Sequence, residues 1–234
     1  MQAQFAIVQL LLRECALIPE SIMSNYELRA ASLPRFGQRL ALRLLNLFGW
    51  KMRCRPLPGR HGVLIVYPHT SNWDFVIGLL GKWSLGLPLR WLAKESLFRG
   101  PWAGLLRSWG GVAVERGAST GATARLAEKM RESDWFWLAL APEGTRSYRP
   151  NLRSGFYHLA LMAKVPLVIV YLDYPDKELG VMDTIRLTGD QQIDMAAIAA
   201  AYAGHLGKHP ELAAPITLAP ARKDEADGGH GAQG

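Results

Sequence analysis

Short apolar runs alternate with amphipathic segments through the middle of this 234-residue chain. The apolar runs are rich in Val, Ile, Leu and aromatic residues, which is typical of buried strands, and they occupy residues 62–67, 89–93, 112–115, 135–141 and 166–174. The segments between them carry apolar side chains at helical spacing, which predicts helices at residues 72–83, 101–109, 119–133 and 154–164. Strands that alternate with helices in this way predict an α/β fold, with a mostly parallel mixed sheet flanked by helices.

The two ends of the chain differ from this middle part. Residues 182–189 are compatible with an edge strand and residues 192–207 with a closing helix, whereas residues 219–234 are polar, Gly-rich and expected to be unstructured. With 49% hydrophobic residues, the chain can bury one substantial core. We therefore predict an N-terminal helical, amphipathic membrane-association segment over residues 1–58, an α/β domain over residues 59–218 and a short tail.

Positive charge is concentrated in the N-terminal part. The formal net charge of the whole chain is +7, which indicates an anionic partner. No acidic residue occurs between Glu27 and Asp74, a stretch that contains eight Lys and Arg residues. Within it, residues 36–50 place leucines at helical spacing, with Arg39 and Arg43 four positions apart. Such a helix fits an anionic bilayer surface and also fits an ordinary amphipathic helix packed on its own domain, and the pattern leaves both interpretations open.

If this protein contacts lipid, we expect it to lie on the cytoplasmic face of a membrane as a peripheral protein, with no transmembrane helix. The apolar run at residues 5–12 ends at Arg13 and Glu14, far short of the roughly 20 residues that a transmembrane helix requires. It also lacks the basic leader and small-residue cleavage site of a secretory signal. The two cysteines, Cys15 and Cys54, have neither metal-type spacing nor a disulfide pattern, so we expect a reducing compartment and no metal site.

A histidine and a carboxylate follow the first buried strand, in the sequence PHTSNWDF at residues 68–75. His69 and Asp74 are five positions apart, which in one continuous helix would separate them by about 140°. They can cooperate only if His69 lies on the turn and Asp74 in the first helical turn. The carboxylate then orients one ring nitrogen while the other accepts a proton from a hydroxyl, as in a general-base dyad. No cysteine nucleophile lies near this pair in the sequence, and the hydroxyl is expected to belong to the substrate.

Each of these residues also has a purely structural interpretation. Asp74 follows Ser71 at the spacing of a capping box, and the helix dipole favours a carboxylate in a first turn. His69 alone fits a hydrogen-bonded histidine at the end of a strand. The interpretation as a dyad therefore depends on a second site.

A second polar turn, APEGTRSYRP at residues 141–150, follows another buried strand in the same way. Gly144 permits close approach of the backbone, Thr145 supplies a hydroxyl, and the guanidinium of Arg146 matches the geometry of a phosphate. Glu143 is placed to orient Arg146 or to contact a substrate hydroxyl. The alternative is a surface turn made of ordinary turn residues.

Together these residues resemble the glycerolipid acyltransferase family, which includes bacterial 1-acylglycerol-3-phosphate acyltransferase. The resemblance rests on HTSNWD (69–74) and PEGTRS (142–147), with GGVAVERG (110–117) between them and VPLVIVYLDY (165–174) after them. The four blocks occur in order over residues 60–175, and such a combination is far more specific than any one block.

The resemblance implies a reaction and a role for each matching residue. His69 would deprotonate a glycerol hydroxyl and Asp74 would orient it. The acceptor-phosphate site would comprise Arg116, Glu143, Gly144, Thr145 and Arg146. The hydroxyl of a lysophospholipid, most specifically 1-acylglycerol-3-phosphate, would attack an acyl thioester of acyl carrier protein or coenzyme A and give phosphatidate, with no acyl-enzyme and no cofactor. Family members act at the cytosolic membrane face through an N-terminal amphipathic helix pair, which favours the bilayer interpretation of residues 36–50.

The sequence departs from the family pattern at Pro68, where many members have asparagine, and in the TSNWD residues that follow His69. These departures leave other lysolipids, including a lyso-aminolipid, open as acceptors. Two other classes remain open: a basic membrane- or nucleic-acid-binding module without catalysis, and a thioesterase or lipase that uses water at the same dyad. Because the charge lies on an amphipathic segment and no nucleic-acid motif is found, we expect no nucleic-acid partner.

Overall fold

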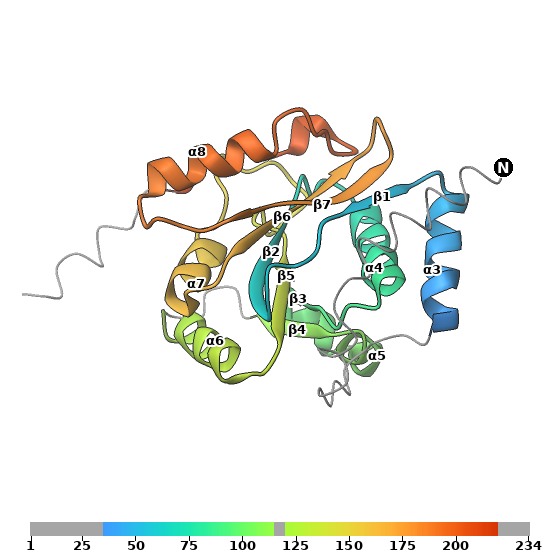
Figure 1. The fold of residues 1–234 in the computed structure, drawn as a ribbon, viewed down its shortest axis with the longest axis horizontal. Coiled ribbons are helices and arrows are strands. Elements are labelled where there is room, and N and C mark those ends of the chain that lie inside the picture. Colours follow the sequence, from blue (N-terminus) through green and yellow to red (C-terminus); the bar gives the residue numbers. More distant parts are fainter. Residues whose placement is uncertain (1–34, 115–119, 220–234) are drawn as a thin grey trace, which may run out of the picture.

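The computed structural model describes residues 35–114 and 120–219, which form an α/β fold (Figure 1). In this part of the chain, seven strands make one sheet in the order β1-β7-β6-β2-β5-β3-β4. The strands are β1 (Lys51–Cys54), β2 (His61–Tyr67), β3 (Arg90–Lys94), β4 (Gly111–Val114), β5 (Phe136–Leu140), β6 (Leu167–Asp173) and β7 (Glu178–Ile185). The helices are α3 (Arg35–Leu47), α4 (Trp73–Leu85), α5 (Ala103–Ser108), α6 (Thr120–Glu132), α7 (Gly155–Ala163) and α8 (Gln191–Ala201), with short 3-10 helices η1 (Glu95–Phe98) and η2 (Pro210–Leu212).

The sheet is mixed but mostly parallel, which confirms the predicted fold class. Strands β6, β2, β5, β3 and β4 run in the same direction. Strand β7 is antiparallel to β6, and β1 pairs in parallel with β7. The apolar runs form the central strands β2, β5 and β6 because these strands are covered on both faces and have no polar face to present.

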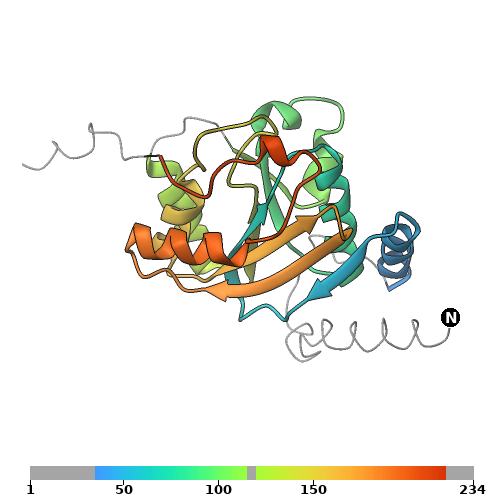
Figure 2. The same ribbon diagram turned by 90° about the horizontal axis from the view of Figure 1, so that it is seen from above.

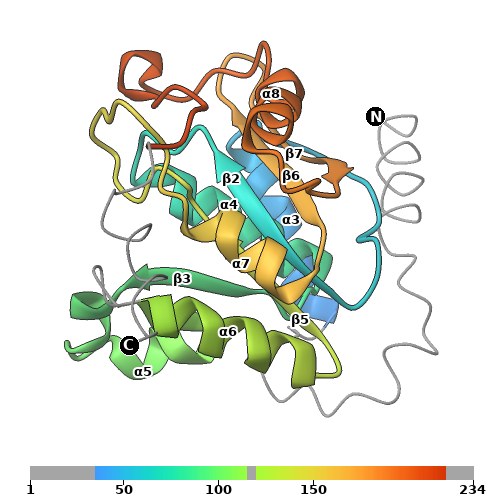
Figure 3. The same cartoon turned by 90° about the vertical axis from the view of Figure 1, so that its left-hand side faces the viewer.

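Two hydrophobic cores lie on opposite faces of the sheet. One joins α6, α7 and α8 to side chains such as Ile65, Leu138 and Ile169 (Figure 3). The other joins α3 and α4 to the alternate residues of the same strands, such as Leu64 and Trp137. Successive side chains of a strand point to opposite faces, so each central strand contributes to both cores.

The edge of the sheet differs from the sequence prediction. Of the segment predicted as an edge strand at residues 182–189, only residues 182–185 are in a strand. They form the second half of β7, which lies inside the sheet. On this side of the sheet the edge strand is instead β1, whose residues Lys51–Cys54 pair with Glu178–Val181 (Figure 2). This strand was missed because its four residues, KMRC, alternate between exposed and half-buried positions and contain no apolar run.

Helix α3 has the two-faced character that the sequence predicted. Its inner side chains Ala41 and Leu45 are buried in the core shared with α4. Its outer face exposes Phe36 and Leu40, and Leu47 and the adjoining Phe48 are also exposed. No helix in residues 35–114 and 120–219 is both long and apolar enough to cross a membrane. The predictions for residues 1–34 and for the tail at 220–234 lie outside the described residues.

Candidate active site

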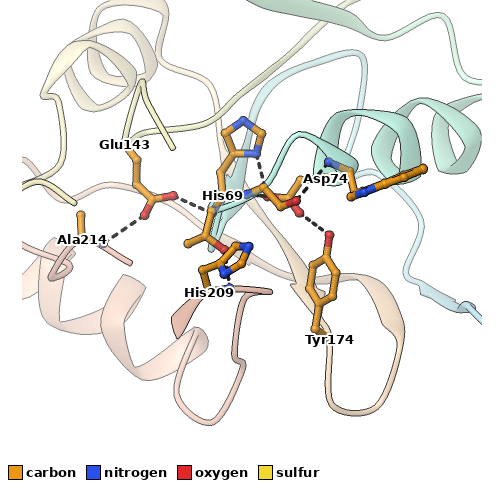
Figure 4. A network of polar contacts seen from close by, with 9 residues as sticks. His69, Asp74, Glu143, Tyr174, His209 and Ala214 are labelled. Atoms are coloured by element: carbon orange, nitrogen blue, oxygen red, sulfur yellow. Dashed lines mark hydrogen bonds and ion pairs between the residues drawn. The ribbon is translucent and has the colours of Figure 1, made fainter. Parts of the chain in front are cut away.

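Three turns meet at the carboxyl ends of the strands because three neighbouring parallel strands, β5, β2 and β6, end there. Strand β2 pairs in parallel with β5 on one side and with β6 on the other. Their carboxyl ends therefore lie side by side, at the place where open α/β sheets bind ligands. The turns that follow carry His69, Glu143 and Tyr174 (Figure 4).

The two residues of the predicted dyad are in contact. His69 lies on the turn after β2 and Asp74 in the first turn of α4, with His69 Nδ1 3.2 Å from Asp74 Oδ2. The Asp74 side chain is 1% exposed and the His69 side chain 17% exposed. Since an ionised carboxylate only accepts hydrogen bonds, Nδ1 carries the proton and Nε2 is left as the basic nitrogen. The ring can therefore take a proton from a group that approaches Nε2.

One half of the capping box that the sequence predicted for Asp74 is present. The backbone N–H of Ser71 donates to Asp74 Oδ2 at 2.8 Å, and the Ser71 hydroxyl accepts from the Trp73 N–H at 3.2 Å. These two bonds satisfy the N–H groups of Ser71 and Trp73 at the start of α4. The Asp74 carboxylate thus bonds the backbone before α4 and also contacts the His69 ring. The structural and the catalytic interpretation of Asp74 are therefore compatible.

The surroundings of Asp74 keep it ionised. Burial raises the pKa of Asp74, but hydrogen bonds from His69, from the Tyr174 hydroxyl and from the Ser71 N–H outweigh burial and leave the pKa below its ordinary value. The Tyr174 hydroxyl donates to Asp74 Oδ1 at 2.5 Å. The imidazole therefore faces a fixed negative charge across the pH range in which it can act as a base.

Glu143 is held by two backbone N–H groups. It is 2% exposed, and its Oε2 accepts the backbone N–H of His69 at 2.6 Å, while its Oε1 accepts the N–H of Ala214 at 3.0 Å (Figure 4). Burial raises the pKa of Glu143, and the two backbone donors offset part of this rise. The side chain links the turn after β5 to the His69 turn and to the C-terminal segment, which brings the two predicted turns together.

The rest of the second turn faces outward. Gly144 has φ +65°, and a Cβ at this position would lie 2.6 Å from Arg153 Nε, so the turn requires glycine. Thr145 is half-buried, and its hydroxyl accepts the Ser147 N–H at 3.3 Å. Arg146 is exposed. Arg116, the remaining predicted phosphate ligand, lies outside the described residues.

An apolar cavity of about 180 Å³ lies between α4 and the sheet, beside the dyad. His69 and Asp74 line it together with mostly aliphatic residues of α4 and of the strands. Gly78 also lines it, and a Cβ placed there meets no atom within 4 Å. Besides Asp74, Lys82 is buried in its wall: its Nζ donates to the Trp109 carbonyl, and burial lowers its pKa to about 8.

Sequence reasoning missed Tyr174 and the C-terminal segment as parts of the site. Tyr174 is the last residue of the predicted strand 166–174, so its place at the carboxyl edge was a usable signal. Ala214 gave no signal, because it contributes only a backbone N–H to Glu143 and a carbonyl to the Tyr67 hydroxyl. No group of three His, Cys, Asp or Glu residues within 35–114 and 120–219 is arranged to hold a metal ion.

Comparison with known proteins supports the resemblance that the sequence blocks suggested. A search of curated proteins gives no match. The crystal structure of the 1-acyl-sn-glycerophosphate (LPA) acyltransferase PlsC from Thermotoga maritima is similar over 85% of this chain and 89% of that chain, with 16% sequence identity and a TM-score of 0.48. The Acyltransferase family model matches residues 51–173, more than half of the 234 residues. The chain therefore belongs to the Acyltransferase family.

Proposed function

We propose that this protein transfers a fatty acyl chain from an acyl thioester to the free hydroxyl of a lysophospholipid, with 1-acylglycerol-3-phosphate as the leading acceptor and phosphatidate as the product. The observation that carries the proposal is the pair His69 and Asp74, 3.2 Å apart and lining an apolar cavity. A base next to a cavity for hydrocarbon is what acyl transfer to a lipid alcohol needs. Membership of the Acyltransferase family supports the same reaction class.

The proposed mechanism needs no covalent acyl-enzyme. Nε2 of His69 takes the proton of the acceptor hydroxyl as its oxygen attacks the thioester carbonyl, and Asp74 stabilises the imidazolium that forms. The carbon–sulfur bond then breaks, and the leaving thiolate of coenzyme A or acyl carrier protein takes the proton from His69. Both reactants must lie within about 3.5 Å of one another for attack, so the acyl carbonyl must lie next to His69.

The cavity is the proposed place of the donor acyl chain. The thioester carbonyl has to reach the His69 side chain, and His69 lines the cavity. The acyl chain attached to that carbonyl would therefore enter the cavity beside His69. The aliphatic lining favours hydrocarbon, at about 25 cal/mol for each Å² of apolar surface removed from water. The acyl chain of the acceptor is the alternative occupant, and the two are separated by varying donor and acceptor chain lengths independently.

The acceptor phosphate is proposed to bind at the outward-facing turn. Arg146 provides an exposed guanidinium, Thr145 a hydroxyl, and Arg116 a second positive charge. We propose a different role for Glu143, because a buried carboxylate held by two backbone N–H groups is poorly placed to meet a second anion. In this proposal Glu143 supports the His69 turn and does not contact the substrate.

We also propose that α3 lies on an anionic membrane surface at the cytoplasmic face. Its outer side combines exposed Phe36 and Leu40 with exposed Arg39 and Arg43. This arrangement buries apolar side chains in the interface while the guanidinium groups remain at the headgroups. Replacing Leu40 by Glu is expected to weaken co-sedimentation with vesicles of anionic phospholipid and to leave binding to zwitterionic vesicles low. Equal binding of the variant and the wild type to anionic vesicles would contradict this proposal.

The central experiment follows an acyl label from thioester to lipid. Purified protein is incubated with labelled acyl-CoA or acyl-ACP and a panel of lysolipids that includes 1-acylglycerol-3-phosphate and a lyso-aminolipid. We expect diacylated product in the wild type and none above background for His69→Ala, with an unchanged circular dichroism spectrum. Near-normal transfer by His69→Ala would refute the mechanism, and release of free fatty acid in place of diacylated lipid would identify a thioesterase or lipase.

A further inference from the structure

The catalytic carboxylate is held on both of its oxygens. Oδ2 of Asp74 accepts from His69 Nδ1 at 3.2 Å and from the Ser71 N–H at 2.8 Å. Oδ1 accepts from the Tyr174 hydroxyl at 2.5 Å (Figure 4). Asp74 is 2% exposed, so bulk water does not readily replace a donor that is lost. The Tyr174 bond, with the Ser71 N–H on the other oxygen, therefore constrains how the carboxylate is rotated relative to the imidazole.

Tyr174 is itself held in place at the end of β6. Its backbone N–H donates to the Leu206 carbonyl at 3.0 Å. Its ring meets the ring of Trp50 edge to face, with centroids 5.0 Å apart and an interplanar angle of 89°. Burial raises the pKa of the Tyr174 hydroxyl, and the bond to Asp74 raises it further. The phenol thus stays protonated and can donate its hydrogen to Asp74.

The ring contact connects the site to α3. Trp50 is 6% exposed, and its backbone N–H donates to the carbonyl of Leu45 in the last turns of α3. Trp50 and Leu45 belong to the same core as α4. A continuous series of contacts therefore leads from α3 through Trp50 and Tyr174 to Asp74.

We propose that Tyr174 is a positioning residue of the acyltransferase, that its hydroxyl fixes the rotation of Asp74 toward His69, and that Trp50 extends this support to α3. This inference rests on the proposed acyl-transfer function. Tyr174 touches Asp74, and no reacting atom of the substrate needs to reach it, so its removal acts on the rate of proton transfer and leaves substrate binding unchanged. Tyr174 lies just beyond residues 51–173, the part of the chain that the family model matches.

The first test is Tyr174→Phe, which removes one oxygen and keeps the ring against Trp50. We expect kcat to fall about tenfold or more, the effect of losing a hydrogen bond to a charged acceptor, with KM for both substrates unchanged. The matched control is Tyr157→Phe, because Tyr157 also donates to a buried carboxylate, that of Asp194, at 2.8 Å, and lies on the other side of the sheet. That variant is expected to lose stability but not kcat.

A second readout does not depend on activity. The groups that face Asp74 are His69 and the Ser71 N–H from its own turn and Tyr174 from the end of β6, with the charge of Glu143 acting from the turn after β5. Since the Tyr174 bond lowers the pKa of Asp74, Tyr174→Phe should raise that pKa, which a titration of the Asp74 carboxyl carbon by NMR measures. The Tyr157→Phe control should leave this titration unchanged.

The link through Trp50 is tested by a double-mutant cycle. Trp50→Phe keeps an apolar ring but loosens the edge-to-face contact with Tyr174. Made in the wild-type protein, it should lower kcat by less than Tyr174→Phe does. Made in the Tyr174→Phe variant, it should cause little further loss. Additive losses would remove Trp50 from the proposal. If Tyr174→Phe did not fold, an unchanged kcat for Trp50→Phe would by itself overturn the coupling to α3.

The outcomes separate this inference from the proposed function. If the wild type transfers no acyl chain to any lysolipid, the proposed function fails, and the NMR titration still tests the role of Tyr174. If the wild type is active and folded Tyr174→Phe has a kcat within twofold of it, the positioning role is overturned. An unchanged Asp74 titration in Tyr174→Phe would overturn it as well.

Discussion

The two turns at the carboxyl edge of the sheet differ in how far they are organised before a substrate arrives. In the turn after β2, Thr70, Ser71 and Asp74 are buried, and the backbone of His69 is held by Glu143. In the turn after β5, every residue from Ser147 to Pro150 is exposed, and so is Arg146. Only Glu143, at the start of the second turn, belongs to the buried network of the first.

This difference matches the two tasks that acyl transfer sets. Proton transfer requires the ring and the carboxylate at fixed positions, and preorganised charges act most strongly where water is excluded. Binding a phosphate requires cations that remain hydrated until the anion arrives, because a guanidinium buried without a partner would destabilise the protein that has no substrate bound. In the proposed function, the buried turn therefore serves proton transfer and the exposed turn binds the head group.

The largest expected effect comes from breaking the buried turn at Asp74. Asp74→Asn removes the anionic partner of His69 and places an amide where a carboxylate accepts three hydrogen bonds. We expect kcat to fall by about 10² to 10⁴, the usual contribution of one proton-transfer group. Initial rates of acyl transfer at saturating substrate measure this change.

The control for this change is Asp194→Asn. Asp194 is also buried, accepts a tyrosine hydroxyl and two backbone N–H groups, and lies at the start of α8 away from the dyad. The control should destabilise the protein against urea but keep kcat. Equal losses of kcat in the two variants would mean that general destabilisation explains the Asp74 effect.

The sequence was sufficient for the framework of the fold but not for its edge. The apolar runs predicted β2, β5 and β6 to within a residue or two, because a strand covered on both faces can only be apolar. Strand β1 was missed because an exposed edge strand is selected for charge and not for burial. Its position depends on pairing with β7, a contact between residues more than 120 positions apart.

Sequence reasoning reached candidate residues for the site but not their contacts. His69 and Asp74 became candidates because four sequence blocks occur together, since each of the two residues alone also fits a structural role. The contacts of Glu143 were not foreseen, since its partners are the backbone N–H groups of His69 and Ala214, and any residue except proline offers such a donor. Tyr174 was not foreseen because it meets Asp74 across 100 positions of sequence.

A substitution in the exposed turn is expected to change the KM for the acceptor. Arg146→Ala should raise KM for a phosphate-bearing acceptor about tenfold and leave kcat and the KM for the thioester almost unchanged, because a charged hydrogen bond made in both ground and transition states is lost. Arg149→Ala, an exposed arginine three positions along the same turn, is the control and should change neither constant. A rise confined to the KM for the thioester would move the proposed phosphate site away from this turn.

The smallest expected effect concerns the cavity on the buried side and separates the place of the hydrocarbon from that of the head group. Gly78→Ala puts a methyl group into free space in the cavity wall, and alanine is the better helix former, so the variant should be at least as stable as the wild type. The methyl displaces about one methylene of bound chain, worth about 0.8 kcal/mol, so kcat/KM should fall about fourfold for the longest donor chains and stay constant for short ones. Gly104→Ala, in α5, also meets open space but is not part of the cavity wall, and it should have no effect at any chain length. If the dependence on chain length appeared with the acceptor instead of the donor, the cavity would hold the chain of the lysolipid, and the buried turn would then face both the hydroxyl and the hydrocarbon of one substrate.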